Sequence, residues 1–470
     1  MTIGQHFAPT IISSSTRALG PGNTNFILRS PRTAPFSPLP ATLQKNRTVY
    51  IGRRDFSTLA LLFKAQGWTR VEQMEDARVV YFSQRPIPEP ALRPYQRYSR
   101  LPPSHEFPNK KRMFEGLQDW SDAAGQPLWF VPETFRLTDS QSSKNNQPLM
   151  EMFRKRLYEQ GGLDQTWVLK NAALDNGEGI TFLPAQSHAL KNVQEAMDNS
   201  TAKCVEKNPT ALQYQSCSTQ FVVQRYVDNL LTWFDGEKFD LRFYWFVASI
   251  DPWIVYSHDG FARVSAQKHF DATDWSTPQN HLTVHSGSAL QNVTHEFIWQ
   301  RVRAFATKHN VTTRPAMDPV EHVRNQIKHI LSSVVAAMRY KLTTRQNGKN
   351  ENDKSDEHPN NFALFGVDLM LDQNLDVYLI EVQHAPDMGM YDSYRAKMAQ
   401  QVLSPILGMV EEIQNKQELD PSANLYPLDA NVGLYEVITA GDWRYTYRGY
   451  RRQEQNQPLQ AQARSILSTT

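Results

Sequence analysis

The sequence that decides the fold is Phe362-Ala-Leu-Phe-Gly-Val-Asp-Leu-Met-Leu371, followed closely by Asp376-Val-Tyr-Leu-Ile-Glu-Val-Gln-His-Ala-Pro386. Both stretches are typical of buried strands, because apolar residues occupy most positions. Each strand nevertheless contains a carboxylate, Asp368 in the first and Glu381 in the second. Burying a carboxylate is costly unless it pairs with a cation, so these two positions predict a cation site. An exposed hairpin with two solvated acids is the alternative.

The spacing of the two strands favours a metal ion. A two-residue turn at Gln373-Asn374 would place Asp368 opposite Leu379, and alternation along the strand puts Leu379, Glu381 and Gln383 on one face. Diagonal neighbours on two strands lie about 7–8 Å apart at Cα. Oxygen ligands around one or two cations can span that distance, and oxygen ligands with room for water suit Mg²⁺.

Length and composition exclude several classes of protein. A chain of 470 residues is long for one core and predicts two or three packed subdomains. The net charge of +2 argues against a nucleic-acid binder, and no apolar run approaches the roughly 20 residues of a membrane-spanning helix. Cys204 and Cys217 follow no metal-ligand pattern and predict free thiols in a reducing compartment. We therefore expect a soluble, cytoplasmic monomer.

The organisation of the chain follows from changes in composition. The segment before Asp55 contains no acidic residue and is rich in Ser, Thr and Pro; this predicts a disordered leader, with an organelle transit peptide as the alternative. Residues 443–452 are basic and aromatic, so they could contact an acidic partner or pack on the core. The predicted parts are a leader (1–46), a small N-terminal α/β domain (47–105), a central domain (106–220), a C-terminal domain (221–412) with a disordered loop (343–361), and a C-terminal extension (413–470).

Candidate nucleotide-binding residues occur in order along the chain. Lys170 ends an apolar strand and precedes a loop in which Gly177 and Gly179 would let backbone N–H groups approach phosphate oxygens. An ordinary hairpin turn is the alternative. The strand that contains Gln224, Arg225, Tyr226 and Val227 is suited to hydrogen bonds with an adenine edge, although it could be only a strand.

A second group of polar residues is more specific. Strand alternation puts Lys238, Asp240 and Arg242 on one face, where they could hold a base, a ribose and a terminal phosphate. A solvated ladder of ion pairs is the alternative. Arg263 adds a second guanidinium, and Thr283 adds a hydroxyl between His281 and His285.

These motifs together resemble the tubulin–tyrosine ligase-like family of the ATP-grasp superfamily over residues 48–410. The motifs that carry the resemblance are Trp167-Val-Leu-Lys, Gly177-Glu-Gly-Ile, Val223-Gln-Arg-Tyr, Lys238-Phe-Asp-Leu-Arg, His281-Leu-Thr, Leu364-Phe-Gly-Val-Asp and Leu379-Ile-Glu-Val. The resemblance implies an α/β (α+β) ATP-grasp fold with a small N-terminal α/β domain, a central domain and a C-terminal antiparallel-sheet domain.

The resemblance also implies roles for individual residues. Lys110 and Lys170 would contact ATP phosphates, Gln224 to Val227 would line the adenine, and Lys238 and Asp240 would hold the nucleoside. Arg242 and Arg263 would be catalytic, facing the γ-phosphate or the reacting groups. The magnesium ligands would be Asp368, Glu381 and Gln383, and the cofactors ATP and Mg²⁺.

Three positions depart from the family pattern. Gln383 stands where the family usually has Asn, Val284 replaces Asn in the motif His-Leu-Thr-Asn, and Asn176 replaces a basic residue before the glycine loop. A displacement of about 1 Å at such a site can slow a reaction on the order of a hundredfold, so the departures bear on activity.

The resemblance implies a ligase that adds an amino acid, Glu, Gly or Tyr, to an acidic protein tail such as that of tubulin, through an acyl phosphate. No nucleic acid or membrane partner is expected, and the protein could associate with the cytoskeleton. A catalytically impaired relative that binds nucleotide or protein as a regulatory module is the alternative, and a ligase with a non-tubulin acceptor is a third reading. The motifs do not identify the donor or the acceptor.

Overall fold

The structure is a computed structural model of the 470-residue chain. The chain divides into two units, Met1–Lys45 and Asn46–Thr470. The leader predicted for residues 1–46 lies outside the described residues. The structure describes residues 47–52, 57–81, 96–101, 107–138, 147–172, 174, 177, 179–185, 189–207, 220–234, 236–265, 270–283, 290–313, 316–348, 361–384, 386, 388, 393–420 and 424–447.

The largest sheet has seven strands in the order β13-β12-β9-β10-β14-β15, with β11 also paired to β10. Every pairing in it is antiparallel. The long strands β9 and β10 are almost wholly buried, which fits their continuous apolar sequence. The strands are β9 (Phe239–Ile250), β10 (Trp253–Ser265), β11 (Leu290–Thr294), β12 (Ala363–Leu371), β13 (Val377–His384), β14 (Tyr435–Ala440) and β15 (Trp443–Arg444).

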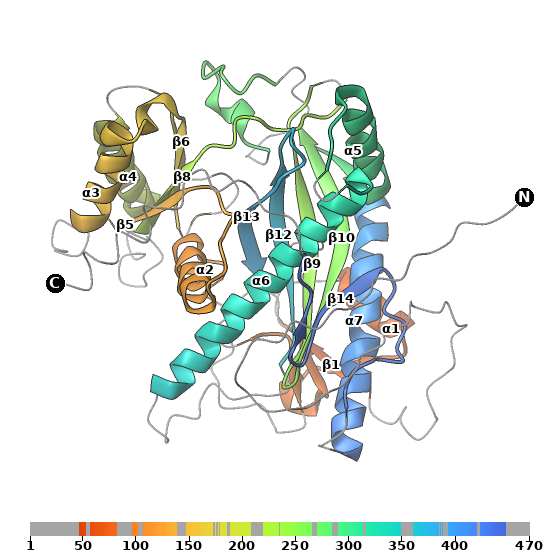
Figure 1. Ribbon diagram of the computed structural model, residues 1–470. Helices are drawn as coiled ribbons and strands as arrows, with labels where there is room; N and C mark the ends of the chain where they lie inside the picture. Colours follow the sequence, from red (N-terminus) through yellow and green to blue (C-terminus); the bar gives the residue numbers. More distant parts are fainter. Residues whose placement is uncertain are drawn as a thin grey trace, which may run out of the picture. The chain divides into compact units, whose positions relative to one another are not determined.

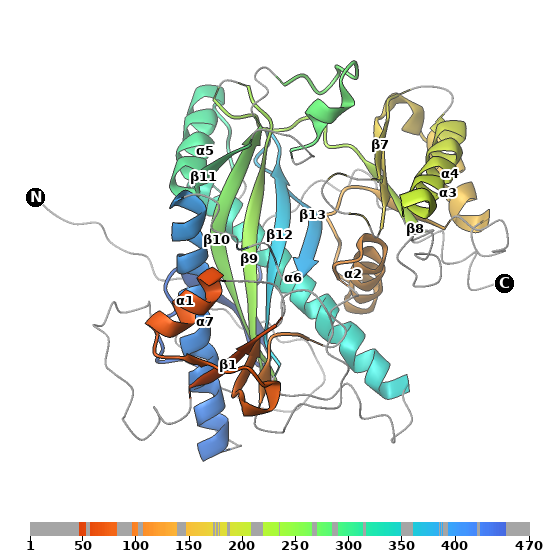
Figure 2. The same ribbon diagram turned by 180° about the vertical axis from the view of Figure 1, so that it is seen from behind.

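Helices cover both faces of this sheet (Figures 1 and 2). On one face, Phe243 and Trp245 belong to a core that includes α5 (His295–His309) and α6 (Pro319–Gly348). On the other face, Phe246 belongs to a core that includes α7 (Ser393–Leu419). The two cores follow from strand alternation, because neighbouring residues of β9 point to opposite faces.

A second sheet has the order β5-β8-β6-β7 and is also antiparallel. Its apolar side chains pack against α3 (Gln147–Glu159) and α4 (Ala189–Lys207), which lie beside it in Figure 1. The helix α2 (Lys110–Ala124) begins after Asn109, whose side chain accepts the N–H of Arg112 at 3.1 Å. The strands are β5 (Thr134–Thr138), β6 (Trp167–Asn171), β7 (Ile180–Leu183) and β8 (Gln220–Arg225).

The N-terminal part of the second unit is a small parallel sheet in the order β2-β1-β3-β4. The predicted strand–helix–strand start is present, and α1 (Ser57–Ala65) is followed by Gly67 at φ +81°. Arg47 holds this sheet on α7 through an ion pair with Glu411 at 2.7 Å. The strands are β1 (Thr48–Ile51), β2 (Thr69–Arg70), β3 (Val79–Tyr81) and β4 (Arg97–Tyr98).

Two segments differ from the sequence prediction. Residues 343–348 of the predicted disordered loop are helical instead, because α6 continues to Gly348. The hydroxyls of Thr343 and Thr344 donate to carbonyls of the preceding turn, which lets these polar residues remain helical. Residues 349–360 of the predicted loop lie outside the described residues. The predicted boundary at residue 412 falls inside α7. The domain boundaries as a set remain predictions.

The described part of the C-terminal extension belongs to the core. Strand β14 pairs with β10, matching Val437 with Tyr256. The hydroxyl of Tyr445 donates to Asn325 of α6 at 2.7 Å, and the guanidinium of Arg444 lies 5.2 Å from the Trp120 ring centroid of α2. Residues 443–447 therefore pack on the core, as the second alternative predicted.

Within the described ranges, none of the helices is both long enough and apolar enough to span a bilayer.

Candidate active site

The carboxylates of β12 and β13 lie directly opposite each other, because Asp368 pairs with Glu381. The predicted pairing of Asp368 with Leu379 is wrong. A bulge after Asp368 shifts the register, so that Leu369 faces Leu379 instead. The two carboxylates are therefore direct neighbours rather than diagonal ones.

The connection between these strands is also longer than the predicted two-residue turn, because it runs from Asp372 to Asp376. One oxygen of Asp372 accepts the backbone N–H groups of Asn374 at 2.9 Å and Asp376 at 2.8 Å. Leu375 adopts a left-handed conformation at φ +64°. The side chain of Asp372 thus stabilises a longer turn in place of the predicted two-residue turn.

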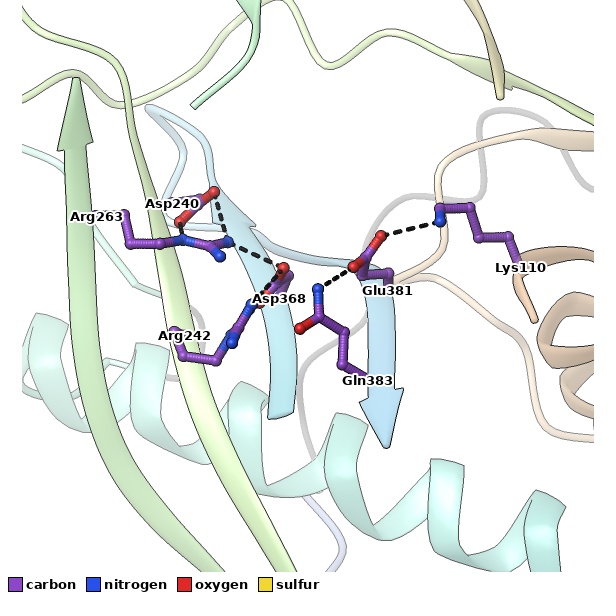
Figure 3. Close-up of polar contacts among 7 residues, drawn as sticks. All are labelled: Lys110, Asp240, Arg242, Arg263, Asp368, Glu381 and Gln383. Carbon is purple, nitrogen blue, oxygen red and sulfur yellow. Dashed lines mark hydrogen bonds and ion pairs between the residues drawn. The ribbon is translucent and has the colours of Figure 1, made fainter. Parts of the chain in front are cut away.

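Asp368 is held by two arginines, one on the neighbouring strand β9 and one on β10, the next strand in the sheet (Figure 3). Arg242 of β9 donates through Nε to Oδ1 at 2.5 Å and through Nη2 to Oδ2 at 3.1 Å. Arg263 of β10 reaches Oδ2 through Nη2 at 2.9 Å. Arg263 also holds Asp240 through two bonds of 2.7 and 2.8 Å.

This network contains two cations and two anions, and all four residues are largely buried. Burial alone would raise the pKa of Asp368, but Arg242 and Arg263 outweigh it and lower that pKa to about 2. Burial raises the pKa of Asp240, and Arg263 offsets this only in part. Because the two positive and two negative charges balance, their pairing offsets much of the desolvation cost of burying them.

Glu381 has a different environment. One oxygen forms an ion pair with Lys110 of α2 at 3.3 Å, and the other accepts the side-chain amide of Gln383 (Figure 3). The backbone carbonyl of Leu174 also accepts from Lys110 at 2.9 Å. Among the described residues, no group of three or more His, Cys, Asp or Glu side chains could hold a metal ion. Metal ligation here would rest on Asp368, Glu381 and the amide oxygen of Gln383.

Three buried lysines extend from Glu381 toward Tyr226. Lys110, Lys170 and Lys238 are 5%, 9% and 1% exposed. Burial and the charge of Lys110 lower the pKa of Lys170 to about 8, and burial lowers the pKa of Lys238 to about 7, with the charge of Lys170 contributing. Buried lysines that lie close enough for their positive charges to repel form a site that favours anions.

The nitrogen of Lys170 donates to the Gln224 side chain at 2.7 Å. That of Lys238 donates to the backbone carbonyl of His281. The hydroxyl of Tyr226 lies 2.9 Å from His281 Nδ1. Thr283 Oγ1 is buried and has no hydrogen-bond partner in the described part of the chain. These groups supply polar contacts and one unused hydroxyl for a ligand.

The structure divides the four residues predicted to line adenine. The side chains of Gln224 and Tyr226 face Lys170 and His281. Those of Arg225 and Val227 line a cavity of about 210 Å³ at the β12–β13 turn instead. Strand alternation explains this division only for Gln224 and Arg225, because β8 ends at Arg225, and Tyr226 and Val227 follow it.

The glycines of the predicted phosphate loop adopt left-handed conformations, with φ +77° at Gly177 and +67° at Gly179. The carbonyl of Gly179 accepts the N–H of Asn171 at 3.0 Å, which closes the loop after β6. Two departures from the family pattern, Asn176 and Val284, lie outside the described residues.

Sequence reasoning missed two glycines that make room for Arg242. An added Cβ at Gly260 would lie 2.9 Å from the Arg242 carbonyl carbon and still closer to its oxygen. An added Cβ at Gly366 would lie 3.3 Å from Arg242 Cδ. Gly260 sits where the β9–β10 register shifts, which only the pairing of the strands reveals.

Comparison with solved structures identifies the fold. The C-terminal domain of Pby1 from K. lactis, described as an ATP-grasp enzyme that interacts with the mRNA decapping enzyme Dcp2, matches 83% of this chain and 98% of its own. The TM-score is 0.53 at 13% sequence identity. The fold of this chain is therefore the ATP-grasp fold, as predicted.

The family follows from the sequence. The chain belongs to the tubulin-tyrosine ligase family, whose sequence model matches residues 89–419. This confirms the resemblance noted above.

Curated relatives share about a quarter of their residues with this chain. Tubulin glycylase 3A of Drosophila melanogaster is 25% identical over 281 residues, which cover 57% of this chain and 24% of that protein. Tubulin polyglutamylase ttll-5 of Caenorhabditis elegans is 25% identical over 63% of this chain and 38% of that protein. The probable alpha-tubulin polyglutamylase Ttll1 of Tetrahymena thermophila is 26% identical over 72% of this chain and 79% of that protein. The chain thus spans well under half the length of the first two relatives.

Proposed function

We propose that this chain is an ATP- and Mg²⁺-dependent ligase that joins an amino acid to a carboxylate of an acidic protein tail, such as that of tubulin. The observation that carries the proposal is the buried network of Arg242, Arg263, Asp240 and Asp368 beside Glu381, on an ATP-grasp fold. The relatives named glycylase and polyglutamylase support Gly or Glu as the donor, and the family name supports Tyr.

The residues present fit a magnesium ion and a nucleotide. Two facing carboxylates and an amide oxygen are a usual magnesium set when phosphates complete it. The unused hydroxyl of Thr283 and the buried lysines offer contacts to a polyphosphate and a sugar. When bound, Mg²⁺ would neutralise phosphate charge that otherwise repels an attacking carboxylate.

The chain's own side chains would act mainly by position and charge. An acceptor carboxylate oxygen would attack the γ-phosphorus, the bond from that phosphorus to the bridging oxygen would break, and ADP would leave. Arg242 and Arg263 would stabilise the charge on the transferred group through their N–H donors. The donor amine would then attack the acyl carbon and lose a proton while phosphate leaves, giving an amide. No enzyme nucleophile is required.

A second candidate is a catalytically impaired relative that acts as a nucleotide- or protein-binding regulatory module. Gln383 is the observation in its favour, because its amide group donates to the Glu381 carboxylate. That bond occupies an oxygen which the proposed ligase needs for metal.

Replacing Glu381 with Gln is expected to reduce amino-acid incorporation at least about a hundredfold, because it removes a carboxylate from the reacting centre without changing its shape. Radiolabelled incorporation with all twenty amino acids, into purified tubulin and into cell lysate, measures the activity and names the donor. The thermal midpoint of the variant serves as the folding control.

The same assay separates the two candidates. Q383N is expected to raise incorporation if the longer side chain impairs the site. If neither wild type nor Q383N incorporates any amino acid while both bind Mg·ATP, the regulatory reading replaces the ligase.

ATP binding is expected to weaken as pH rises through about 8. The pKa of Lys170 is about 8 without ligand, and a phosphate beside it favours the charged form and raises that pKa. Binding at pH 8 should therefore take up roughly half a proton at Lys170. Calorimetric titration of ATP in two buffers of different ionisation enthalpy measures the uptake. K170R, whose side chain stays charged, should bind ATP without this part of the proton uptake. Equal proton uptake by both proteins would exclude Lys170 as the group that takes up the proton.

A further inference from the structure

We propose that Trp275 is a wall of the nucleobase subsite and stacks on the purine ring of the bound nucleotide. This inference rests on the proposed function, because it assigns a residue to the same nucleotide site. Trp275 lies in the segment that follows β10 and leads into the short helix η3 (Pro278–His281).

The chain around Trp275 is polar and exposed, whereas the indole itself is half-buried. Two aspartates fix the backbone on either side. Asp271 accepts the N–H of Thr273 at 2.8 Å, and Asp274 accepts the N–H of Ser276 at 2.9 Å. A large aromatic ring at a braced position in a polar segment is well placed to meet a ligand.

The orientation of this segment is tied to His281. The ring nitrogen Nε2 of His281 donates to the Asp274 carbonyl at 2.7 Å, and Nδ1 then accepts from the Tyr226 hydroxyl at 2.9 Å. Burial lowers the pKa of His281, which favours the neutral ring that this pair of bonds requires. The backbone next to Trp275 is therefore connected through His281 to Tyr226, a predicted nucleotide-binding residue.

The indole itself contacts three aromatic rings at the site. It stacks on His281 with a centroid distance of 3.8 Å and an interplanar angle of 11°. It meets Tyr226 edge-on at 5.4 Å and Phe182 of β7 at 5.3 Å. Lys238 closes the group, because it donates to the His281 carbonyl and lies 5.4 Å from the Tyr226 ring.

The charged network drawn in Figure 3 shares no residue with this aromatic group. The arginines, and Glu381 through a bound Mg²⁺, would suit phosphates, whereas Trp275, Tyr226 and Phe182 offer aromatic surface that phosphates cannot use. Stacking of a base on an aromatic side chain changes affinity by about 5- to 150-fold when the side chain is removed. The expected ligand is a purine nucleoside triphosphate, since a purine presents the larger surface for stacking.

The test compares two ligands that share a triphosphate group. Calorimetry measures the affinity of the full chain for Mg·ATP and for magnesium tripolyphosphate, which has no base. W275A is expected to weaken ATP binding by about 5- to 150-fold and leave tripolyphosphate binding unchanged. W275F, which keeps an aromatic face, is expected to restore most of the ATP affinity.

A spectroscopic readout comes from the indole itself. ATP is expected to change the tryptophan emission of the wild type and of W443F, the matched control on β15, but not that of W275F. If W275A loses affinity for both ligands equally, or for neither, the assignment of Trp275 is overturned while the proposed function stands. A wild type that binds neither ligand would overturn the proposed function and this inference together.

Discussion

Arg242→Met is expected to lower the free energy of unfolding by about 3–5 kcal/mol, the usual effect of removing one partner of a buried ion pair. Arg242 and Asp368 are 6% and 7% exposed and share two hydrogen bonds. Methionine keeps the aliphatic part of the side chain, so the change removes mainly the charge. The network then holds two carboxylates against Arg263 alone. Urea denaturation followed by circular dichroism measures the loss.

Two further variants make this measurement specific. The double variant R242M/D368L removes one charge of each sign and is expected to recover part of the stability, because the remaining Arg263–Asp240 pair is balanced. R154M is the matched control, since Arg154 pairs with Glu151 on the exposed surface, and no measurable change is expected. A loss in R242M no larger than in R154M would show that the network contributes nothing to stability.

Gly260→Ala is expected to cost about 3 kcal/mol of stability and most of the proposed ligase activity. The new methyl group would lie 2.9 Å from the Arg242 carbonyl carbon, which belongs to the backbone of β9 and cannot rotate away. The strands must separate locally, and such overpacking typically costs up to about 3 kcal/mol. Arg242 would move with its strand, so its guanidinium, the proposed catalytic group, would move away from Asp368.

The control for this variant is Gly408→Ala. An added Cβ at Gly408 of α7 would meet only Ala430 Cβ, at 3.8 Å, which is an ordinary contact. Alanine in a helix is favoured over glycine by about 0.5–1 kcal/mol, so G408A should be neutral or stabilising. Guanidinium denaturation of both variants compares them directly, and a G260A protein as stable as G408A would contradict the clash.

Much of the charged network could be predicted from local pattern. Alternation alone placed Lys238, Asp240 and Arg242 together, and the apolar surroundings of Asp368 marked it as a buried acid, whereas Glu381 is only partly buried. These inferences succeed because strand period and the cost of burying charge are local properties of the sequence.

The rest depends on how distant segments meet. The predicted register at Asp368 was wrong because a bulge inserts one residue between the paired strands. The turn is also longer than predicted, because the Asp372 side chain accepts hydrogen bonds from backbone N–H groups within it. The identity of the cation near Asp368 could not be read locally either, since Arg242 and Arg263 come from other strands. No sequence pattern pointed to Trp275, because its proposed role depends on a hydrogen bond between Asp274 and His281 that brings it to the site.

The last strand of the main sheet has a consequence for how this protein is made. Strand β14 covers the edge of β10 from Ile254 to His258, yet it is translated long after β10. Until residue 440 has left the ribosome, that length of β10 offers unpaired backbone groups to any neighbouring strand. The growing chain is thus exposed to misassembly at this edge until translation has passed β14, which completes the sheet that holds Arg242, Arg263 and Asp368.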